Sequence, residues 1–482
     1  MASLLDRIDA AVGSTIESAI VGHHRRRLRR RRRLTQLEPP EDGSLWAGGD
    51  PSPREGGDLE VLVDGEVALT RIADALAGAR ESVHIAGWHV TPGFELTRSA
   101  GDRPLRELLG ELAERVDVRV LLWAGAPLPV FSPRRSSVRR VRDELVRGTR
   151  VRCGLDARER PMHCHHEKLV IVDGEVAFVG GIDLTSLGGD RYDDTGHPAR
   201  GGLGWHDAAT CVQGPAVADV AHHFADRWRE IDGERLEPAA PPAPAGDTVL
   251  QVVRTLPDRV YDFAPAGDFR ILEAYVRALR SARSLVYLEN QFLWSPEVVR
   301  ILLDKLRRPT AAEFRLVALL PERPNNGADD TRGQLAALVR ADDGNGRFLA
   351  ATIRSRSGTR TDPLYVHAKV AVVDDAWLTI GSANLNEHSL FNDSEMNVVT
   401  QDRALARDTR LQLWAEHLER ELDEVSGDPT HVVDTLWKPI AAEQLERRRR
   451  GEPVTHRLCE LPGVSRRSRA LLGPIQSFMV DA

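Results

Sequence analysis

Histidine and lysine recur at one fixed spacing in two distant parts of the 482-residue chain. In each copy a lysine follows the histidine by two positions, an aspartate follows the lysine by five, and a glycine follows the aspartate by seven. The two copies, offset by 201 residues at every position, are His166, Lys168, Asp173 and Gly180, and His367, Lys369, Asp374 and Gly381. Two in-register copies of a four-position pattern are poorly explained by coincidence.

The choice of lysine at these positions is itself informative. The chain has 65 lysines and arginines, but only four of them are lysines, and Lys168 and Lys369 are two of those four. This use of lysine indicates that both positions require a compact ammonium group rather than a planar guanidinium.

The apolar, largely β-branched residues after each lysine (168–172 and 369–373) predict a strand in each copy. Residues two apart on a strand share a face, so each histidine should point with its lysine, whereas Asp173 and Asp374 should support the strand ends. Two imidazoles and two ammoniums facing one cleft describe a site for a phosphate anion. One histidine can attack phosphorus and the other can protonate the leaving alkoxide, with no metal or cofactor.

The two copies lie in two similar halves of the chain. A helix-like stretch and then a strand-like stretch occur at 68–80 and 82–88, and again at 271–282 and 284–291. This alternation is typical of α/β units with a largely buried sheet. We therefore expect an α/β fold of two similar lobes from an internal duplication. Each lobe should be a mixed β-sheet flanked by helices, with one active site shared at the interface.

Shifts in composition predict the boundaries of these parts. The expected parts are a basic amphipathic N-terminal segment (1–42), a first lobe (43–236), a Pro/Ala linker (237–247), a second lobe (248–425) and a C-terminal extension packed on the lobes (426–482).

The segments around both copies resemble the phospholipase D superfamily, and the resemblance extends over nearly the whole chain. The segments that resemble motifs of true phospholipases D are 165–174, 178–184, Trp205-His206-Asp207, Glu289-Asn290-Gln291-Phe292, 381–386 and 393–395. Two positions depart from the usual pattern: Asp183 stands where many members have asparagine, and Gly181 stands where they have serine.

The resemblance implies a role for each matched residue. His166 would be the nucleophile that forms a phosphohistidine, and His367 would be the general acid that later activates water. The residues implied to hold the phosphoryl oxygens are Lys168, Lys369 and Asn384.

An acid after each motif is implied to orient the histidine, and the best matches are Asp207 for His166 and Glu395 for His367. Further residues expected at the substrate site are Asp183, Ser382, Glu289, Asn290, Gln291 and Trp205.

Two other interpretations of these residues are less favoured. The run His163-Cys164-His165-His166 could suggest zinc, but alternation along a strand divides it between two faces and no CxxC partner is present. We therefore expect no metal and no cofactor. The motifs could also be relics in an inactive protein, but both copies retain histidine and lysine.

The N-terminal segment has an unusual order of features. Apolar residues recur at helical spacing through Ile20, and eight arginines follow within 25–33, the reverse of a secretory signal. A solvated tail, a contact with anionic lipid head groups and a contact with nucleic acid stay open as interpretations. We expect that this segment affects access to lipid and not catalysis.

Composition limits the class of protein. The chain is 41% hydrophobic and 28% charged with a formal net charge of −7, which is ordinary for a globular protein and disfavours a nucleic-acid coat protein. No run of 18 apolar residues predicts a membrane span, and four scattered cysteines suit a reduced compartment. We therefore expect a cytoplasmic protein with a peripheral contact to an anionic membrane surface.

The expected activity follows from the resemblance. It is hydrolysis of the distal phosphodiester of a phospholipid to phosphatidate and an alcohol through a phosphohistidine, with transphosphatidylation where an alcohol replaces water. The alternatives are a cardiolipin-synthase-like phosphatidyltransferase, a phosphodiesterase acting on nucleic acid, and a lipid-binding protein without activity.

Overall fold

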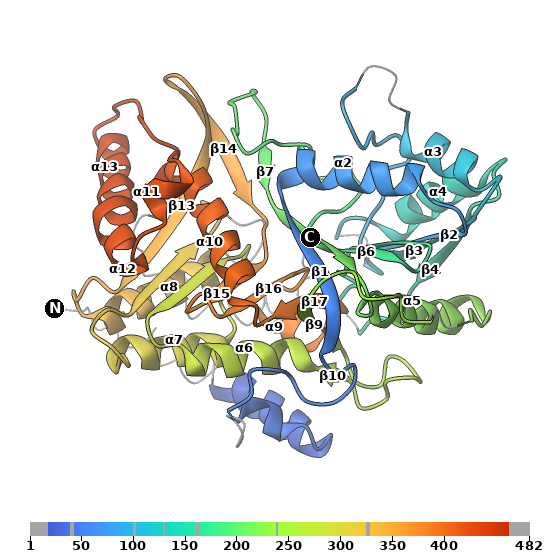
Figure 1. Cartoon of the computed structure of the whole chain (residues 1–482), viewed down its shortest axis with the longest axis horizontal. Helices are drawn as coiled ribbons and strands as arrows, with labels where there is room; N and C mark the ends of the chain where they lie inside the picture. Colours follow the sequence, from blue (N-terminus) through green and yellow to red (C-terminus); the bar gives the residue numbers. More distant parts are fainter. Residues whose placement is uncertain are drawn as a thin grey trace.

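The two halves of the chain form two lobes that lie side by side in a computed structural model (Figure 1). The structure describes residues 18–38, 43–99, 103–128, 131–160, 163–237, 240–323 and 328–461. The expected α/β fold of two similar lobes is confirmed.

The first lobe follows a short 3-10 helix, η1 (Leu34–Leu37). Its elements are β1 (Arg54–Val63), α2 (Asp64–Ala77), β2 (Ser82–Gly87), α3 (Leu105–Leu112), β3 (Asp117–Trp123), α4 (Arg135–Val146), β4 (Arg152–Asp156), β5 (Leu169–Val172), β6 (Val176–Gly180), β7 (Gly204–His206), β8 (Ala208–Gln213) and α5 (Val217–Asp232).

The second lobe repeats this order. Its elements are β9 (Thr248–Leu256), β10 (Asp268–Phe269), α6 (Arg270–Ser281), β11 (Leu285–Glu289), α7 (Pro296–Arg307), β12 (Arg315–Leu319), α8 (Ala328–Asp342), β13 (Phe348–Ser357), β14 (Arg360–Val366), β15 (Val370–Val373), β16 (Trp377–Gly381), α9 (Glu387–Phe391), β17 (Glu395–Thr400) and α10 (Arg403–Leu418). The chain continues through α11 (Leu422–Val425), α12 (Pro429–Val432), a π-helix η2 (Val433–Trp437), α13 (Lys438–Arg449) and β18 (Leu458–Glu460), which pairs with β13.

The two sheets have the same strand order. It is β4-β3-β2-β5-β6-β8-β1 in the first lobe and β13-β12-β11-β15-β16-β17-β9 in the second. In each sheet the first three strands are parallel and the rest antiparallel. Strands β1 and β9 pair with each other, and β6 and β8 contact β16 and β17, so the inner strands of the two lobes form the interface.

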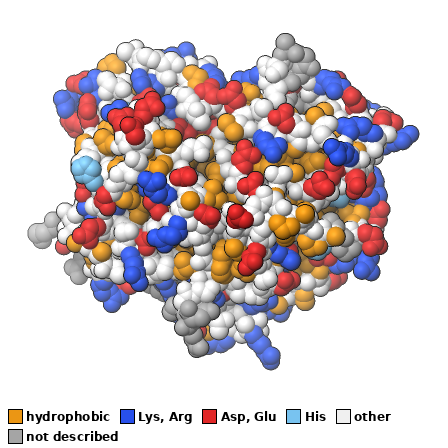
Figure 2. Space-filling view, in the orientation of Figure 1, with side chains coloured by type: hydrophobic (Ala, Val, Ile, Leu, Met, Phe, Trp, Pro, Cys, Tyr) orange, Lys and Arg blue, Asp and Glu red, His pale blue; other side chains and the backbone are white. Residues whose placement is uncertain are grey.

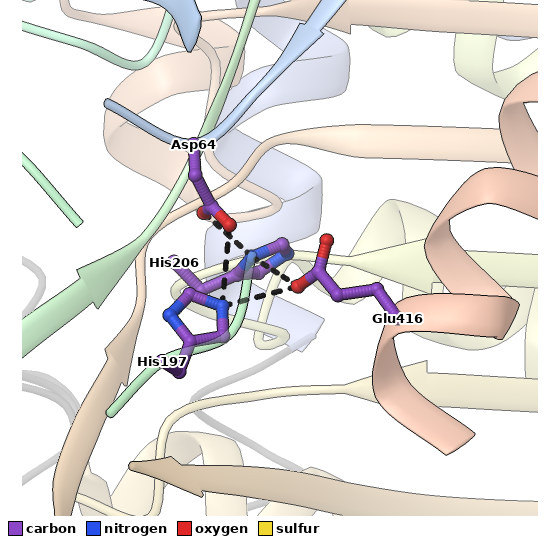
Figure 3. A group of neighbouring side chains, drawn as sticks. All are labelled: Asp64, His197, His206 and Glu416. Carbon is purple, nitrogen blue, oxygen red and sulfur yellow. Dashed lines mark hydrogen bonds and ion pairs between the residues drawn. The ribbon is translucent and has the colours of Figure 1, made fainter. Parts of the chain in front are cut away.

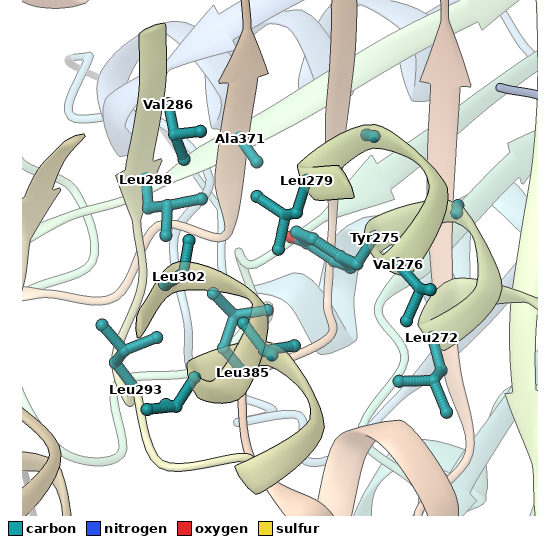
Figure 4. Packing of buried hydrophobic residues seen from close by; sticks show 14 of the residues in the cluster. Leu272, Tyr275, Val276, Leu279, Val286, Leu288, Leu293, Leu302, Ala371 and Leu385 are labelled. Atoms are coloured by element: carbon teal, nitrogen blue, oxygen red, sulfur yellow. The ribbon is translucent and has the colours of Figure 1, made fainter. Parts of the chain in front are cut away.

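Helix α6 shows how the apolar pattern produces the core. Its large apolar residues Leu272, Tyr275, Val276 and Leu279 recur at spacings of three and four, and the helix contacts strands β9 and β17 of the sheet. Figure 4 shows these four residues in one hydrophobic cluster with Val286, Leu288 and Ala371 of β11 and β15. Each such buried side chain contributes roughly 1.5–3 kcal/mol to stability.

Asp173 and Asp374 lie at the strand ends, as strand parity predicts. The carboxylate of Asp173 accepts hydrogen bonds from the backbone N–H groups of residues 80–82, and that of Asp374 accepts from those of residues 283–285. Both residues have positive φ, 56° and 53°, at the turn that follows β5 or β15. These aspartates therefore fix the turn and the neighbouring strand rather than reaching substrate.

The arginine-rich segment is docked on the second lobe rather than projecting as a solvated tail. Residues 18–30 form a helix, dark blue in Figure 1, beneath α6, and Leu28 is fully buried. Arg27 is 8% exposed; its Nε donates to Asp258 (2.6 Å) and its two Nη atoms donate to the Asn392 side chain (2.8 Å) and the Phe391 carbonyl (2.9 Å). The expected apolar stripe before Ile20 lies outside the described residues.

This docking brings the segment close to the catalytic fold, although the site residues begin more than 100 positions later in the sequence. The expectation that it affects access to lipid and not catalysis stays a prediction. Burial of Leu28 and the paired Arg27 fixes the helix against α9, and α9 leads directly to β17 and Glu395. Within the described residues, no helix has the length and apolar character needed to cross a bilayer.

Arg27 provides the first test of this arrangement. Arg27→Ala should lower the free energy of unfolding by about 1–3 kcal/mol, because it removes a buried donor from the Phe391 carbonyl, while Arg31 and Arg160 still pair with Asp258. It should also slow turnover of a soluble phosphodiester, since the α9–β17 turn would lose a contact. Arg26→Ala, on the exposed side of the same helix, is the matched control and should change stability by less than about 0.5 kcal/mol. Equal effects of the two substitutions, measured by urea unfolding, would contradict the docking.

Candidate active site

The two motif histidines face each other across the lobe interface. The ring centroids of His166 and His367 are 6.3 Å apart, and both side chains are buried. Each histidine lies just before its strand, β5 or β15, with its lysine two residues later. The structure therefore brings together the two copies that the sequence separates by 201 residues.

Each histidine is oriented by an acid of the other motif. His166 Nδ1 lies 3.1 Å from Glu395 Oε1, and His367 Nδ1 lies 2.6 Å from Asp207 Oδ2. The expected pairing of Asp207 with His166 and Glu395 with His367 is therefore wrong. Because each Nδ1 faces a carboxylate, it carries the proton and donates it, and the lone pair is on Nε2.

The crossed pairing has a backbone cause. The N–H of His166 donates to the carbonyl of Ser394 (2.9 Å), and the N–H of His367 donates to the carbonyl of His206 (2.7 Å). The segment before each motif strand thus runs beside the acid-bearing segment of the other lobe, as the parallel pairing of β7 with β14 also shows. The acid that follows Ser394 or His206 consequently reaches the imidazole across the interface.

The acids have different surroundings in the two lobes. Ser382 and Ser389 donate from their hydroxyl groups to Glu395, each at 2.5 Å. Gly181 is the counterpart of Ser382, and a Cβ atom there would lie 2.0 Å from an oxygen of Asp207. Glycine at position 181 therefore leaves room for the Asp207 carboxylate, which explains this departure from the family pattern.

The two lysines differ in their charge partners. Lys168 Nζ lies 3.2 Å from Asp183, whose other oxygen accepts from the Trp88 N–H. In the second lobe Asn384 stands in place of Asp183, and both Lys369 Nζ (3.3 Å) and Asn384 Nδ2 (3.2 Å) donate to Gln291 Oε1. Asp183 thus neutralises Lys168, whereas Lys369 has no carboxylate ion pair within the described residues.

Only one member of the Glu289-Asn290-Gln291 segment reaches the motif residues. Gln291 contacts Lys369 and Asn384. Glu289 accepts from His206 (2.8 Å) and His417 (2.9 Å), and Asn290 Oδ1 accepts from the backbone N–H groups of residues 292 and 385. The side-chain oxygens of Glu289 and Asn290 are thus used within the protein, and a role of these two residues in substrate binding stays a prediction.

Trp205 lies directly against the site. Its ring is 4.5 Å from that of His367 and 4.9 Å from that of Tyr365, and its Nε1 donates to the Gly188 carbonyl. The guanidinium of Arg191 lies 3.5 Å from the centre of the same indole ring. Arg191 is not recognisable from the sequence, because nothing in its local sequence sets it apart from the other arginines.

The electrostatics of the site favour an anion. Burial lowers the pKa of Lys369 to about 7, with Lys168 and Arg191 acting in the same direction. Burial, Lys369 and Arg191 together lower the pKa of His367 well below its usual value. Burial raises the pKa of Asp207 to about 6. A bound phosphodiester anion would offset these effects and favour protonation of His367 and Lys369.

A second cluster of chemically active residues lies beside this site. Asp64, His197, His206 and Glu416 point toward one another (Figure 3), and one ligand atom from each falls within a common 4.8 Å. Both His197 and His206 contact Asp64, at 3.2 and 2.9 Å, and Glu416, at 3.0 and 3.4 Å. Mixed nitrogen and oxygen donors of this kind could hold a divalent metal.

This cluster is also linked to the site by the backbone. The N–H of Asp64 donates to the carbonyl of Asp207, and the N–H of Asp207 donates to the carboxylate of Asp64. Burial opposes protonation of His206, but Asp64, Glu289 and Glu416 outweigh it and raise its pKa well above the usual value. The cluster was not found in the sequence because its four residues share no motif.

Two further groups have ligand atoms within the same distance of one another. They are His163, His388 and Asp393, and His206, Glu289 and His417. His165, from the run considered for zinc, instead lies 3.1 Å from Asp156 and 2.9 Å from Ser394.

This geometry, with two duplicated lobes that each supply a histidine and a lysine to one site, defines a phosphodiesterase-type catalytic centre. Residues 75–204 match the family model for phospholipase D, and residues 275–416 match the model described as cardiolipin synthase, PLD-like domain. The chain belongs to the phospholipase D superfamily and is a phospholipase D-type enzyme.

The chain is similar to known proteins at low sequence identity. Phospholipase D alpha 1 of Oryza sativa subsp. japonica is 25% identical, with 82% of this chain and 70% of that protein covered. Phospholipase D A of Dictyostelium discoideum is 24% identical over 75% of this chain and 35% of that protein. The crystal structure of phosphatidylserine synthase from Haemophilus influenzae has the same fold, with a TM-score of 0.51, 12% identity, and coverage of 78% of this chain and 92% of that one.

The pKa values of Asp207 and Lys369 predict a narrow pH range for the free enzyme. Asp207 must be ionised to accept from His367, and Lys369 must be charged to attract phosphate, so kcat/KM for a soluble phosphodiester should rise through about pH 6 and fall above about pH 7. Sulfate keeps its charge over this range. Its inhibition constant should therefore rise above pH 7 in the wild type, because neutral Lys369 no longer attracts it. In Lys369→Arg, which stays charged, sulfate inhibition should no longer depend on pH between 7 and 9. A pH-independent inhibition constant in the wild type would refute the assignment.

Proposed function

We propose that this enzyme hydrolyses the distal phosphodiester of phospholipids through a covalent phosphohistidine on His166. The observation that carries the proposal is the facing pair of imidazoles, with centroids 6.3 Å apart and each Nδ1 directed at a carboxylate. This separation leaves room for one phosphoryl group between two Nε2 atoms, which is the arrangement for in-line displacement.

The first step follows from the proton positions. Glu395 accepts a hydrogen bond from the Nδ1–H group of His166, so the lone pair on Nε2 can attack phosphorus. The P–O bond to the head-group alcohol breaks as the P–N bond forms. His367 Nε2 donates its proton to the leaving oxygen, and Asp207 stabilises the imidazolium before that transfer. Lys168, Lys369 and Asn384 hold the non-bridging oxygens as negative charge develops.

The second step reverses the proton transfer. Neutral His367 accepts a proton from water, the water oxygen attacks phosphorus, and the P–N bond breaks to release phosphatidate. An alcohol in place of water would give transphosphatidylation by the same route. This shared chemistry keeps a cardiolipin-synthase-like phosphatidyltransferase as the second candidate, favoured by the match of residues 275–416 to the model of that name.

The crossed acids give this mechanism a specific test. With a soluble diester whose leaving group is 4-nitrophenolate, little protonation is needed. His367→Ala and Asp207→Asn should therefore still form the intermediate. His166→Ala should form none, because the attacking nitrogen is absent, and Glu395→Gln should slow formation by roughly 10²–10⁴-fold. Alkaline quenching followed by mass spectrometry would detect phosphohistidine on His166. If Asp207→Asn instead behaved like His166→Ala, the crossed assignment would be wrong.

An anionic membrane surface is the partner that the N-terminal helix fits. Arg27 is buried, but arginines on the other side of the helix are exposed, namely Arg25, Arg26, Arg29, Arg30 and Arg32. Each can contribute up to about 1 kcal/mol near an anionic bilayer. On the face seen in Figure 2, acidic and basic side chains are intermixed, so that face lacks the single-sign field that a nucleic-acid site uses.

The two sides of this helix can be separated by experiment. Replacing Arg25, Arg26, Arg29 and Arg30 together by Ala should weaken sedimentation with anionic vesicles and reduce its dependence on salt. Turnover of a monomeric short-chain phospholipid should stay within about twofold, because exposed changes rarely alter the fold. Unaltered vesicle binding would exclude the helix as the membrane contact.

A further inference from the structure

Arg191 is a buried cation whose guanidinium is only partly hydrogen-bonded. The residue is 6% exposed, its Nη2 donates to the Leu187 carbonyl at 3.0 Å, and its Nε and Nη1 find no hydrogen-bond partner among the described residues. Asp183 and Asp207 act on its charge from a distance, but no described carboxylate lies close enough to form a direct ion pair with it. A guanidinium has five N–H donors and is unfavourable when buried without an anion, so these donors indicate a ligand.

The position of Arg191 is fixed by close packing. Its guanidinium stacks on Trp205 at 3.5 Å, and Trp205 also packs against His367. Its backbone carbonyl lies against Gly65, where a Cβ atom would come within 1.6 Å of it. The guanidinium group of Arg191 is therefore held beside the site by packing and is not a mobile surface group.

Two cations of the site, Lys369 and Arg191, lack a direct ion pair among the described residues. Lys168 is paired with Asp183, and the acids Asp207 and Glu395 are used by the two histidines. A phosphodiester carries one negative charge, and Lys168, Lys369 and Asn384 already supply donors for its two non-bridging oxygens.

We propose that Arg191 is a substrate-binding residue that takes a second anionic group beside the phosphodiester, so that the enzyme prefers phospholipids whose head group carries a carboxylate or a second phosphate. The forked geometry suits bidentate binding of either group. This inference rests on the proposed phospholipase activity and adds a substrate class to it.

The test compares two lipids that differ in head group alone. Short-chain phosphatidylserine and phosphatidylcholine with the same acyl chains, below their micellar concentrations, remove surface charge as a variable. The wild type should favour phosphatidylserine in kcat/KM by roughly tenfold or more, the size of one charge-assisted pair. Arg191→Gln should bring the ratio near one by losing the phosphatidylserine rate, and Arg191→Lys should retain part of it.

Arg98→Gln is the matched control. Arg98 is an exposed arginine that stacks on Tyr192, the next residue to Arg191, at 4.9 Å, and its replacement should leave the ratio unchanged. If Arg191→Gln does not fold, inhibition of the wild type by glycerophosphoserine against glycerophosphocholine gives the same comparison without a variant.

The outcomes are distinguishable. Cleavage of neither lipid would reject the proposed function. Cleavage of both at equal kcat/KM, or an equal loss of both in Arg191→Gln, would overturn the inference, since Arg191 would then act on the shared phosphodiester or on the fold.

Discussion

The site depends on a reciprocal pair of backbone hydrogen bonds between the two lobes. The N–H groups of His166 and His367 donate to carbonyls at Ser394 and His206, so each histidine is held by the strand that carries the other lobe's acid. Neither lobe can complete an oriented imidazole alone, because the carboxylate that receives its Nδ1 proton belongs to the partner lobe. The interface strands β6, β8, β16 and β17 set the distance between the two rings, and the rest of each sheet supports those strands.

The two lobes are nearly symmetric, but a few residue differences between them give the two motifs different surroundings. Asp183 neutralises Lys168, whereas Asn384 leaves Lys369 unneutralised and with a pKa near 7. Glu395 accepts from two serine hydroxyls in addition to His166, whereas Gly181 removes one such donor from Asp207. Glu395, beside the histidine proposed as nucleophile, therefore accepts more side-chain hydrogen bonds than Asp207 does. Fewer donors allow the pKa of Asp207 to rise to about 6 beside the histidine proposed as acid and base.

The sequence was sufficient for the duplication, the lobes and the paired histidines and lysines, because each of these follows from local spacing and strand parity. It failed where contacts depend on how two lobes meet. The acid that follows each motif in the same lobe is Asp207 for His166 and Glu395 for His367, but the crossing of segments at the interface reverses both pairings. The same limit hid Arg191, whose packing on Trp205 is a tertiary contact. The sequence also does not show that the Glu289 carboxylate accepts hydrogen bonds from His206 and His417.

The N-terminal helix extends the same reasoning to a segment outside the duplication. By composition alone, residues 25–33 are a uniform basic run. In the structure the helix buries Arg27 on one face and leaves the neighbouring arginines exposed on the other. Arg27 is held by Asp258 and by the turn that leads to Glu395, while its exposed neighbours face away from the second lobe. Helix α9 precedes Glu395, the acid that orients His166. The buried guanidinium of Arg27 is therefore the physical link between the N-terminal helix and the segment that positions a motif histidine.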